Sequence, residues 1–401
     1  MKSDPQRLER IRTALAAAGL DAIAAALPAS VLMLSGYCPV VGTAIAIATA
    51  AGRVGVLAPR DERDLAQNAR AVCLFDPASL QDLRGTADAA RQPLADLLAS
   101  LDLPADTRAR IGHEGGEASQ PAAYAAVHLY GDALPRLLAD IAPNASLAPA
   151  GAVLRALRAV KTDVEIAAIR RACSVAAAAF EQGAARLHPG PTEAEAAAHF
   201  RTPLYVLPRD DLDEVRADGF AWCMSGPNAY HAFAAYQRSR GRRLQSGDLV
   251  LVHCNSYVGG YWTDVTRTYC LGRPTGRQRQ MYDAVFAARE AALAAICPGA
   301  RASDVDRAAR DVMRRRGFGD AFKHPTGHGV GFAAIDHNAP PRLHPASADV
   351  LEAGMVFNVE PGIYIQGECG MRHCDMVAIT PAGCELLTPF HGDVASLSVG
   401  V

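Results

Sequence analysis

Long apolar runs, dense clusters of one charge sign and closely spaced cysteine pairs are all missing from this sequence of 401 residues. No stretch of about 18 strongly apolar residues runs without a break, and the Ala-rich segment 40–51 is short and contains Gly and Thr. The formal net charge is −2, and no group of Lys and Arg residues is dense. A membrane span and a nucleic-acid partner are therefore not expected.

The ten cysteines include no C-x-x-C pair, which argues against a disulfide scaffold and against a zinc ribbon. Segment 1–7 is charged and leads into an amphipathic pattern rather than an apolar stretch with a cleavage site, so no export signal is expected. A reducing cytoplasm fits both features, and a cytoplasmic location is the expectation.

The chain is longer than the ~250–300 residues at which single cores stop growing, so two domains are expected. Half of the residues are apolar and 20% are charged, as in ordinary globular proteins. Segment 142–151 lacks periodicity and contains Pro143 and Pro149, which makes it the predicted linker. The predicted domains are residues 1–150 and residues 151–401.

Short helices and strands are predicted in residues 1–150. Leu8, Ile11 and Leu15 recur at helical spacing, and Gly19 ends that pattern, so a helix is expected over 7–18. Short buried strands are expected at 21–27, 43–48 and 53–57, and a further helix at 93–101. The pattern predicts a small α/β domain.

The second domain is predicted to open with a long helix. Thr162 is a candidate N-cap, with Glu165 three residues later, and the amphipathic pattern runs to near Gly190. Beyond Tyr205 the sequence changes to apolar strands interrupted by Gly, His, Asp and Glu. The chemistry is expected in this part.

Segments 247–253 and 260–268 read as a strand, a turn and a second strand. Such a hairpin can bring His253 and Asp264, eleven residues apart, to one face of a sheet. A hydrogen-bonded core Asp is the alternative interpretation of this segment alone.

Three further segments carry candidate ligands. His328 lies among three glycines in segment 323–331, where another group can approach its ring closely, or where it is a plain turn residue. Glu360 ends the apolar strand 355–360, and buried Glu is rare unless it is paired or coordinated. His373, Cys374 and Asp375 are three possible ligands on another extended segment. Together the four segments predict a metal site built on a sheet.

The order and spacing of these segments resemble those of the pita-bread hydrolases, which include aminopeptidase P, prolidase, methionine aminopeptidase and the metal-free creatinase branch. Segment 7–36 also resembles the start of that family's N-terminal domain, and segment 154–171 the start of its catalytic domain. The resemblance implies a small creatinase-like α/β domain followed by a pita-bread catalytic domain of the α/β (α+β) class. It also implies a homodimer.

By this resemblance, Asp264 matches the bridging Asp of a dinuclear metal site, His328 its single His ligand and Glu360 its first Glu. His253 stands where the family has the non-bridging Asp, and Cys374 stands where it has the second, bridging Glu. Both departures fall on the second of the two metal positions.

The replacements imply one transition metal ion on Asp264, His328 and Glu360, with help from His253 or Cys374. Imidazole and thiolate favour zinc or iron over manganese or magnesium, and the predicted ion is zinc, iron or manganese. The alternative is that Cys374 is a small buried residue and His253 a hydrogen-bonded core imidazole.

Three more histidines match substrate-binding positions of the family. His324 lies four residues before His328, His337 lies nine residues after it instead of the usual seven, and His231 lies near a further substrate-binding His. The predicted catalytic residues are thus His324, His337, Glu360 and His231. Trp222, Tyr230, Phe233 and Tyr236 are expected either to wall a substrate pocket or to belong to the core.

The resemblance implies a hydrolase of the Xaa-Pro peptidase type, in which metal-bound hydroxide attacks an amide or related C–N bond of a small peptide-like substrate. Glu360 ligates and takes the water proton, while His324 and His337 stabilise the oxyanion. One alternative is metal-free C–N hydrolysis like that of creatinase, with His as the acid and base. Another is a binding module without activity.

Overall fold

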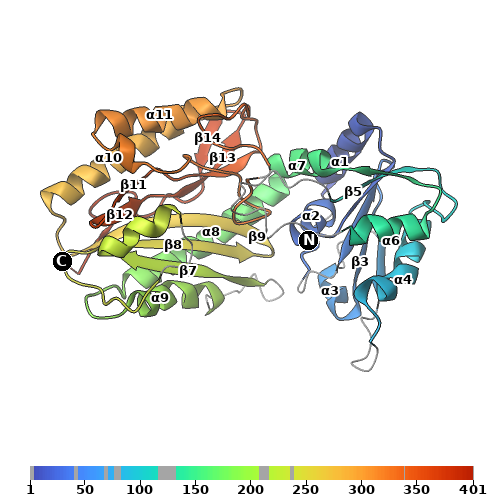
Figure 1. Ribbon diagram of the computed structural model, residues 1–401, viewed down its shortest axis with the longest axis horizontal. Coiled ribbons are helices and arrows are strands. Elements are labelled where there is room, and N and C mark those ends of the chain that lie inside the picture. Colours follow the sequence, from blue (N-terminus) through green and yellow to red (C-terminus); the bar gives the residue numbers. More distant parts are fainter. Residues whose placement is uncertain are drawn as a thin grey trace. The chain divides into compact units, whose positions relative to one another are not determined.

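The computed structural model describes residues 4–39, 44–66, 71–75, 83–115, 132–206, 216–234, 239–337 and 339–400. The chain divides into two units, Met1–Arg158 and Ala159–Val401, and Figure 1 labels many of their elements. The domain boundary at residue 150 stays a prediction.

The first unit is built on a mixed sheet whose strand order is β4-β3-β2-β1-β5-β6. β1 pairs antiparallel with β2 and parallel with β5, which places it in the interior of the sheet. The three strands predicted from the sequence correspond to β1, β2 and β3. The strands are β1 Ala22–Ala25, β2 Ile45–Thr49, β3 Val54–Pro59, β4 Ala71–Phe75, β5 Arg110–His113 and β6 Ser146–Pro149.

The helices of the first unit confirm two predictions. Helix α1 ends where predicted, because Gly19 adopts a left-handed conformation at φ 63° and donates its N–H to the last turn. Helix α4 begins seven residues before the predicted start at Pro93, which lies inside the helix although proline favours the first turn. The helices are α1 Pro5–Ala18, α2 Pro28–Ser35, α3 Arg63–Ala66, α4 Thr86–Ser100, α6 Ala133–Ile141 and α7 Gly151–Ala159.

A four-stranded sheet with the order β15-β9-β8-β7 carries the central hairpin of the second unit. Gly259 and Gly260 form its two-residue turn, and their φ angles of 59° and 86° are those of a type I′ turn. The predicted strand–turn–strand is confirmed. The strands are β7 Ala217–Ser225, β8 Leu249–Val258, β9 Tyr261–Leu271 and β15 Ser398–Val399.

Two smaller sheets complete the described strands of the second unit, one with the order β10-β13-β14 and one formed by β11 and β12. A bridge between Thr266 and Cys374 joins the segment between β12 and β13 to the central hairpin. The strands are β10 Val356–Val359, β11 Gly362–Ile365, β12 Cys369–Arg372, β13 Asp375–Thr380 and β14 Gly383–Leu386.

Helix α8, Asp163–Ala184, confirms the predicted capping box of Thr162 and Glu165, although it ends six residues before Gly190. Ala172 packs against Ala217 and Val258, so α8 covers one face of the β7–β8–β9 sheet. Three helices that the sequence did not predict follow. They are α9 Glu193–Val206, α10 Gly276–Ala294 and α11 Ala302–Arg315.

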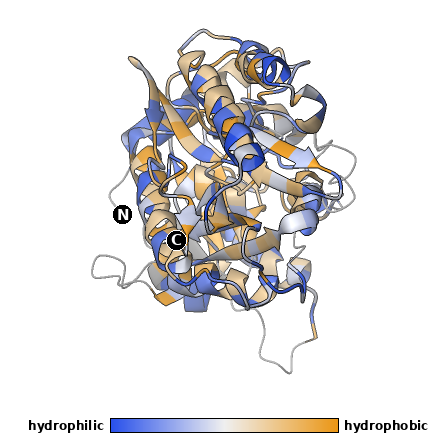
Figure 2. Ribbon diagram, turned by 90° about the vertical axis from the view of Figure 1, so that its left-hand side faces the viewer, coloured by the Kyte–Doolittle hydropathy of each residue, from blue (hydrophilic) through white to orange (hydrophobic). Residues whose placement is uncertain are grey.

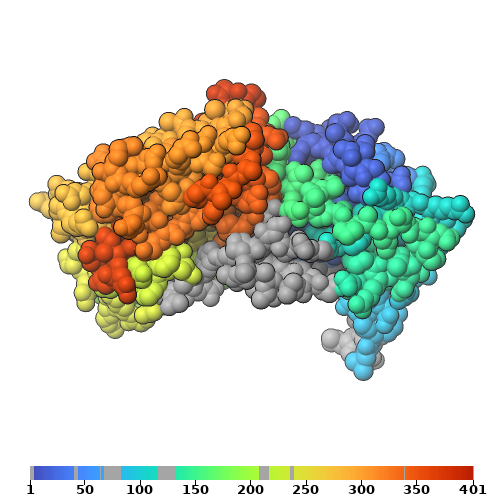
Figure 3. Space-filling model, turned by 45° about the horizontal axis from the view of Figure 1, so that its top comes forward, coloured from blue at the N-terminus to red at the C-terminus, as the bar shows by residue number. Residues whose placement is uncertain are grey.

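Figure 3 shows α10 and α11 in orange as a continuous outer surface. In Figure 2 hydrophilic residues are prominent on the helices, while the inner strands are mostly hydrophobic. In the part of the chain that the structure describes, every helix is too short or too polar to cross a lipid bilayer. Three 3-10 helices complete the described elements, η1 Arg60–Glu62, η2 Gly226–Phe233 and η3 Gly319–Ala321.

A buried ion-pair network anchors β13 beside the central hairpin. Asp375 accepts hydrogen bonds from Arg267 Nη2 at 2.6 Å, from Arg289 Nε at 2.5 Å and from Thr388 Oγ1 at 2.8 Å. Asp375 and Arg267 are both fully buried, so each charge depends on the other for solvation. The network fixes the start of β13, and therefore the position of the adjacent Cys374.

The substitution Asp375→Asn should destabilise the second unit by about 3–5 kcal/mol, because it leaves Arg267 buried without its counter-charge. The matched control is Glu385→Gln, which breaks the exposed pair of Glu385 with Arg170 and should cost less than about 1 kcal/mol. Urea unfolding at pH 7 measures both. Equal losses in the two variants would contradict the structural role of the network.

Candidate metal centre

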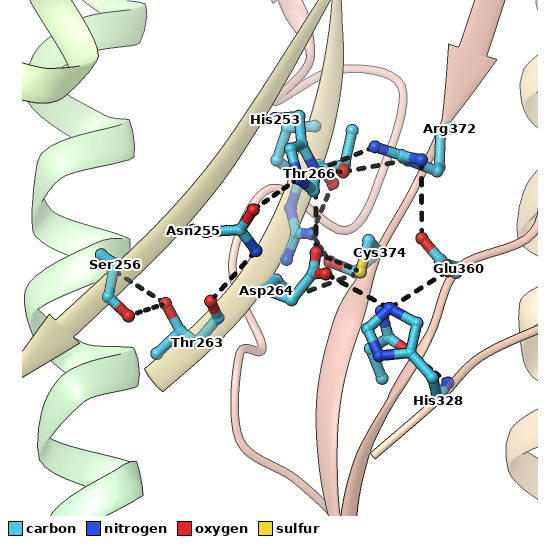
Figure 4. Close-up of polar contacts among 12 residues, drawn as sticks. His253, Asn255, Ser256, Thr263, Asp264, Thr266, His328, Glu360, Arg372 and Cys374 are labelled. Carbon is cyan, nitrogen blue, oxygen red and sulfur yellow. Dashed lines mark hydrogen bonds and ion pairs between the residues drawn. The ribbon is translucent and has the colours of Figure 1, made fainter. Parts of the chain in front are cut away.

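Four side chains from separate segments of the second unit meet in one buried cluster (Figure 4). One oxygen each of Asp264 and Glu360 and the sulfur of Cys374 lie within 4.8 Å of one another. His328 joins them, because its Nε2 lies 3.5 Å from Asp264 and 3.7 Å from Glu360. The structure thus brings these four predicted ligands together, and the fifth, His253, also contacts the cluster, because its Nδ1 lies 3.6 Å from Asp264 Oδ1.

Each ligand is positioned by a different local feature. Asp264 lies in the middle of β9, Glu360 follows the end of β10, and Cys374 lies between β12 and β13. Gly327, next to His328, lies so close to the backbone carbonyl of Asn358 that a Cβ would collide with it. A glycine is therefore required for the loop of His328 to approach β10.

Three contacts of the cluster have the length expected between ligands that share a metal ion. Contacts of 3.5 and 3.7 Å from His328 are longer than ordinary N–H···O hydrogen bonds of about 2.7–3.2 Å. Ligands bound tetrahedrally at ~2.0–2.3 Å lie roughly 3.3–3.8 Å apart. The Sγ of Cys374 lies 3.5 Å from Asp264 Oδ1, in the same range. The donor set of carboxylate, imidazole and thiol is one that zinc accepts.

The tautomer of His328 also fits metal ligation. Its Nδ1 lies 3.0 Å from the carbonyl oxygen of Gly329, an acceptor that requires the proton on Nδ1. Asn358 accepts a hydrogen bond from the backbone N–H of His328 through Oδ1, so its Nδ2 faces Nε2 at 3.1 Å. With Nδ1 protonated, Nε2 is the nitrogen that gives up its proton when His328 becomes neutral, so it is the one that can ligate a metal ion beside the two carboxylates.

The charges of the cluster shift the pKa values in opposite directions. Burial opposes the charged form of His328, but Asp264 and Glu360 outweigh it and raise the pKa of His328 to about 9. Burial raises the pKa of Glu360 to about 7, against the lowering effects of Arg372 and His328. Burial also raises the pKa of the Cys374 thiol well above its ordinary value. Protons on His328 and Cys374 therefore limit the negative charge of the cluster at neutral pH.

His253 lies on the same face as Asp264, because it pairs with Thr266 while Asp264 pairs with Asn255. Its Nδ1 is 2.8 Å from Arg372 Nη2, and a guanidinium only donates, so Nδ1 is the acceptor. Nε2 then carries the proton and donates to Asn255 at 3.0 Å. Both ring nitrogens are engaged, and burial lowers the pKa of His253 to about 4. His253 is a neutral partner of Arg372 in this structure.

Arg372 contacts both His253 and Glu360, and so connects the two sides of the site (Figure 4). Its Nη1 lies 3.6 Å from Glu360 Oε2, and its Nε donates to Thr266 Oγ1 at 3.1 Å. It is buried, and a buried arginine within a strand is rare unless it is paired. No role was predicted for Arg372. The signal in the sequence is a charged residue in an extended segment that also contains candidate ligands.

His324 and His337 lie beside the cluster in different settings. The Nε2 of His324 is 2.8 Å from the hydroxyl of Tyr364, and its Nδ1 is 2.8 Å from the carbonyl oxygen of Pro325. The ring of His337 packs edge-on against that of His328, with centroids 4.8 Å apart. Burial lowers the pKa of each to about 3, so both rings are neutral at pH 7.

Two other residues of the predicted site segments have no described side-chain contact with the cluster. His231 is half-buried in η2, and its described contact is with the ring of Tyr230 at 5.3 Å. His373 lies 3.2 Å from Asp375 and belongs to the buried ion-pair network, so only Cys374 of that segment reaches the cluster.

The predicted aromatic wall is partly core. Trp222, Tyr230 and Phe233 are partly buried and pack against a core cluster that includes Tyr364, and Trp222 also stacks on His253 with centroids 4.8 Å apart. Tyr236 lies outside the described residues.

Known proteins provide the family context. A model of metallopeptidase family M24 matches residues 167–381. An Xaa-Pro dipeptidase of Pyrococcus furiosus is 32% identical over 59% of this chain and 65% of its own length. A probable dipeptidase PepE of Mycobacterium bovis is 37% identical over 58% of this chain and 59% of its own length. The chain therefore matches less than two thirds of each of these relatives.

A solved structure covers more of the chain. The crystal structure of the dipeptidase PepE from Mycobacterium ulcerans aligns with 99% of this chain and 98% of its own, at 28% identity and a TM-score of 0.73. The expected fold, an N-terminal domain followed by a pita-bread domain, is confirmed by this likeness over both units.

Metal affinity should rise with pH between 7 and 9, because a bound ion must displace the protons held by His328 and Cys374. Each displaced proton contributes about a tenfold rise per pH unit. Calorimetric titration with zinc in buffers of different ionisation enthalpy measures the affinity and the protons released. Cys374→Ser should release about one proton fewer. An affinity that does not change from pH 7 to 9 would contradict this ligand set.

Proposed function

This chain belongs to metallopeptidase family M24, and from that premise we propose that it hydrolyses an amide bond of a small peptide-like substrate with one divalent transition metal ion. Asp264, His328, Glu360 and Cys374 would hold the ion. The observation that carries the proposal is the contact of His328 Nε2 with both carboxylates at 3.5 and 3.7 Å, beside the thiol.

The charges of the cluster favour one ion over two. Asp264 and Glu360 supply two negative charges, Arg372 supplies one positive charge, and His253 is neutral. A single divalent ion with Cys374 as thiolate makes the cluster neutral, whereas a second ion would leave two excess positive charges in a buried site. Such uncompensated charge is costly in a protein interior.

When bound, the ion would act as a Lewis acid and bring the pKa of a coordinated water from ~15.7 toward ~7. Glu360 is the base placed to take the water proton, because its carboxylate belongs to the cluster. Arg372 lies 3.6 Å from Glu360 Oε2 and holds that oxygen in place.

His337 is the better placed of the two predicted oxyanion donors. It packs against the ligand His328, and its low pKa keeps it a neutral N–H donor at pH 7. Both nitrogens of His324 already bind Tyr364 and Pro325, so His324 would position Tyr364 or exchange partners when substrate enters.

The Xaa-Pro dipeptidase that resembles this chain makes Xaa-Pro dipeptides the first substrates to test. Because His253 and Cys374 stand where the resemblance expects carboxylates, the proposed activity is hydrolysis of an amide bond in general and not Xaa-Pro cleavage in particular. A homodimer and a cytoplasmic location are proposals that follow from the family resemblance and from the cysteine content.

Purified protein should hydrolyse dipeptides with about one equivalent of zinc, iron or manganese bound, and a strong chelator should abolish turnover. His328→Ala should lower the bound metal well below one equivalent and should lower kcat/KM by at least about a hundredfold. The reason is that it removes the nitrogen between the two carboxylates. Turnover that survives the chelator would instead favour metal-free hydrolysis. Ligand-induced thermal stabilisation without turnover would favour a binding module.

The double substitution His253→Asp with Cys374→Glu should raise the bound metal from about one equivalent to about two, because it restores two carboxylates at the second position. The matched control is His188→Asp with Cys297→Glu, which makes the same changes at exposed residues. Elemental analysis of protein purified without chelator measures both variants. Wild-type stoichiometry in the first double variant would contradict the account of the second position.

A further inference from the structure

A group of partly exposed aromatic side chains lies on the same face of the β7–β8–β9 sheet as the candidate ligands. Directly paired residues of antiparallel strands point to the same face. Phe220 pairs with Asn255, and Asn255 pairs with Asp264, so Phe220 and Asp264 share a face. The next pair on that face is Tyr257 with Trp262. We call Phe220, Tyr257 and Trp262 the aromatic shelf.

The rings of the aromatic shelf contact one another. Phe220 and Trp262 are nearly parallel, with centroids 6.4 Å apart and an interplanar angle of 9°, and Tyr257 packs against Trp262 at 4.8 Å. Phe220 is 44% exposed, and the other two rings are half-buried. Covering such water-exposed aromatic surface with an apolar group lowers the free energy, which favours binding of that group.

The shelf adjoins the candidate metal centre rather than the helical layer. Helix α8 packs on the opposite face, through Ala217 and Val258. The backbone N–H of Trp262 donates to Gly331 O at 2.7 Å, in the loop that carries His328 and His337. Trp262 thus lies where the ligand-bearing strand meets the ligand-bearing loop.

The spacing suits one substrate side chain. Trp262 precedes Asp264 by two residues on β9, a separation of ~6–7 Å in a strand. An extended peptide whose amide lies at the metal centre projects the adjacent side chain over a similar distance. Asp218 lies on the same face of the sheet, since it pairs with Tyr257, and its carboxylate is 3.8 Å from Arg201. An apolar side chain therefore fits this surface better than an acidic one.

We propose that the aromatic shelf binds a large apolar or aromatic side chain of the substrate residue next to the hydrolysed amide, and so sets the substrate preference. This inference rests on the proposed function, since it takes the metal centre as the place of reaction. The shelf residues are specificity-determining, and none of them is a ligand.

Direct binding tests the shelf without relying on turnover. Two reduced-amide dipeptide analogues, Phe-Pro and Gly-Pro with the scissile carbonyl removed, are titrated calorimetrically into the metal-loaded protein. The wild type should bind the Phe analogue at least about tenfold more tightly, the usual scale of discrimination by an apolar surface. Trp262→Ala and Phe220→Ala should each reduce this preference to about threefold or less.

The matched control is Tyr205→Ala, which removes an exposed aromatic ring on α9, outside the shelf, and should keep the full preference. The chain has only two tryptophans, so Trp222→Phe leaves Trp262 as the single indole reporter. Its fluorescence should change with the Phe analogue and much less with the Gly analogue. Thermal denaturation checks folding, and the variant of the exposed Phe220 decides the test if Trp262→Ala does not fold.

Equal affinity of the wild type for both analogues, binding of neither analogue, or a full preference retained by Phe220→Ala would overturn the shelf. The proposed function fails separately. A protein that prefers the Phe analogue about tenfold but cleaves no dipeptide would contradict hydrolysis and would still support the shelf as a binding surface.

Discussion

Two buried carboxylates that face one imidazole are the constraint on which the site depends. Asp264 and Glu360 lie 3.5 and 3.7 Å from His328 Nε2, and each is at least nine-tenths buried. Such a cluster requires a positive charge in its centre, because buried carboxylates without a counter-charge are costly. A proton on His328 supplies that charge in the free protein, and a metal ion would replace it. The pita-bread sheets keep the cluster rigid, since each ligand comes from a different strand or loop.

The two residues that the resemblance marks as departures from the family pattern, His253 and Cys374, both have partners in the cluster. His253 is neutral and accepts a hydrogen bond from Arg372, which also lies beside Glu360. The Sγ of Cys374 contacts Asp264 Oδ1 at 3.5 Å. The cluster thus combines two carboxylates with a soft thiol donor and a neutral imidazole, a set that suits zinc.

The sequence predicts features that depend on neighbouring residues better than contacts between residues far apart in the chain. The hairpin of β8 and β9, the end of α1 at Gly19 and the capping box at Thr162 depend on neighbouring residues, and the structure confirms them. The partners of His253 depend on the register between strands and on Arg372, more than a hundred residues away, so no local pattern reveals them.

Helices α9, α10 and α11 were missed for a related reason. Their buried faces mix small alanines with charged residues such as Glu193, Arg289 and Asp306, which weakens the apolar periodicity, although the sequence pattern of α11 is amphipathic. The candidate ligands were found because His, Asp, Glu and Cys stand out in apolar strands. Their polar supports, Thr266 and Asn358, do not stand out in the same way.

X-ray absorption spectroscopy of the zinc-loaded protein tests the central claim most directly, because it reports ligand atoms and neighbouring metals together. The account predicts one sulfur at ~2.3 Å, nitrogen and oxygen ligands at ~2.0–2.2 Å, and no second metal. A spectrum with only nitrogen and oxygen ligands and a metal neighbour at ~3.5–4 Å would contradict it, since that is the signature of a two-metal site without the thiolate.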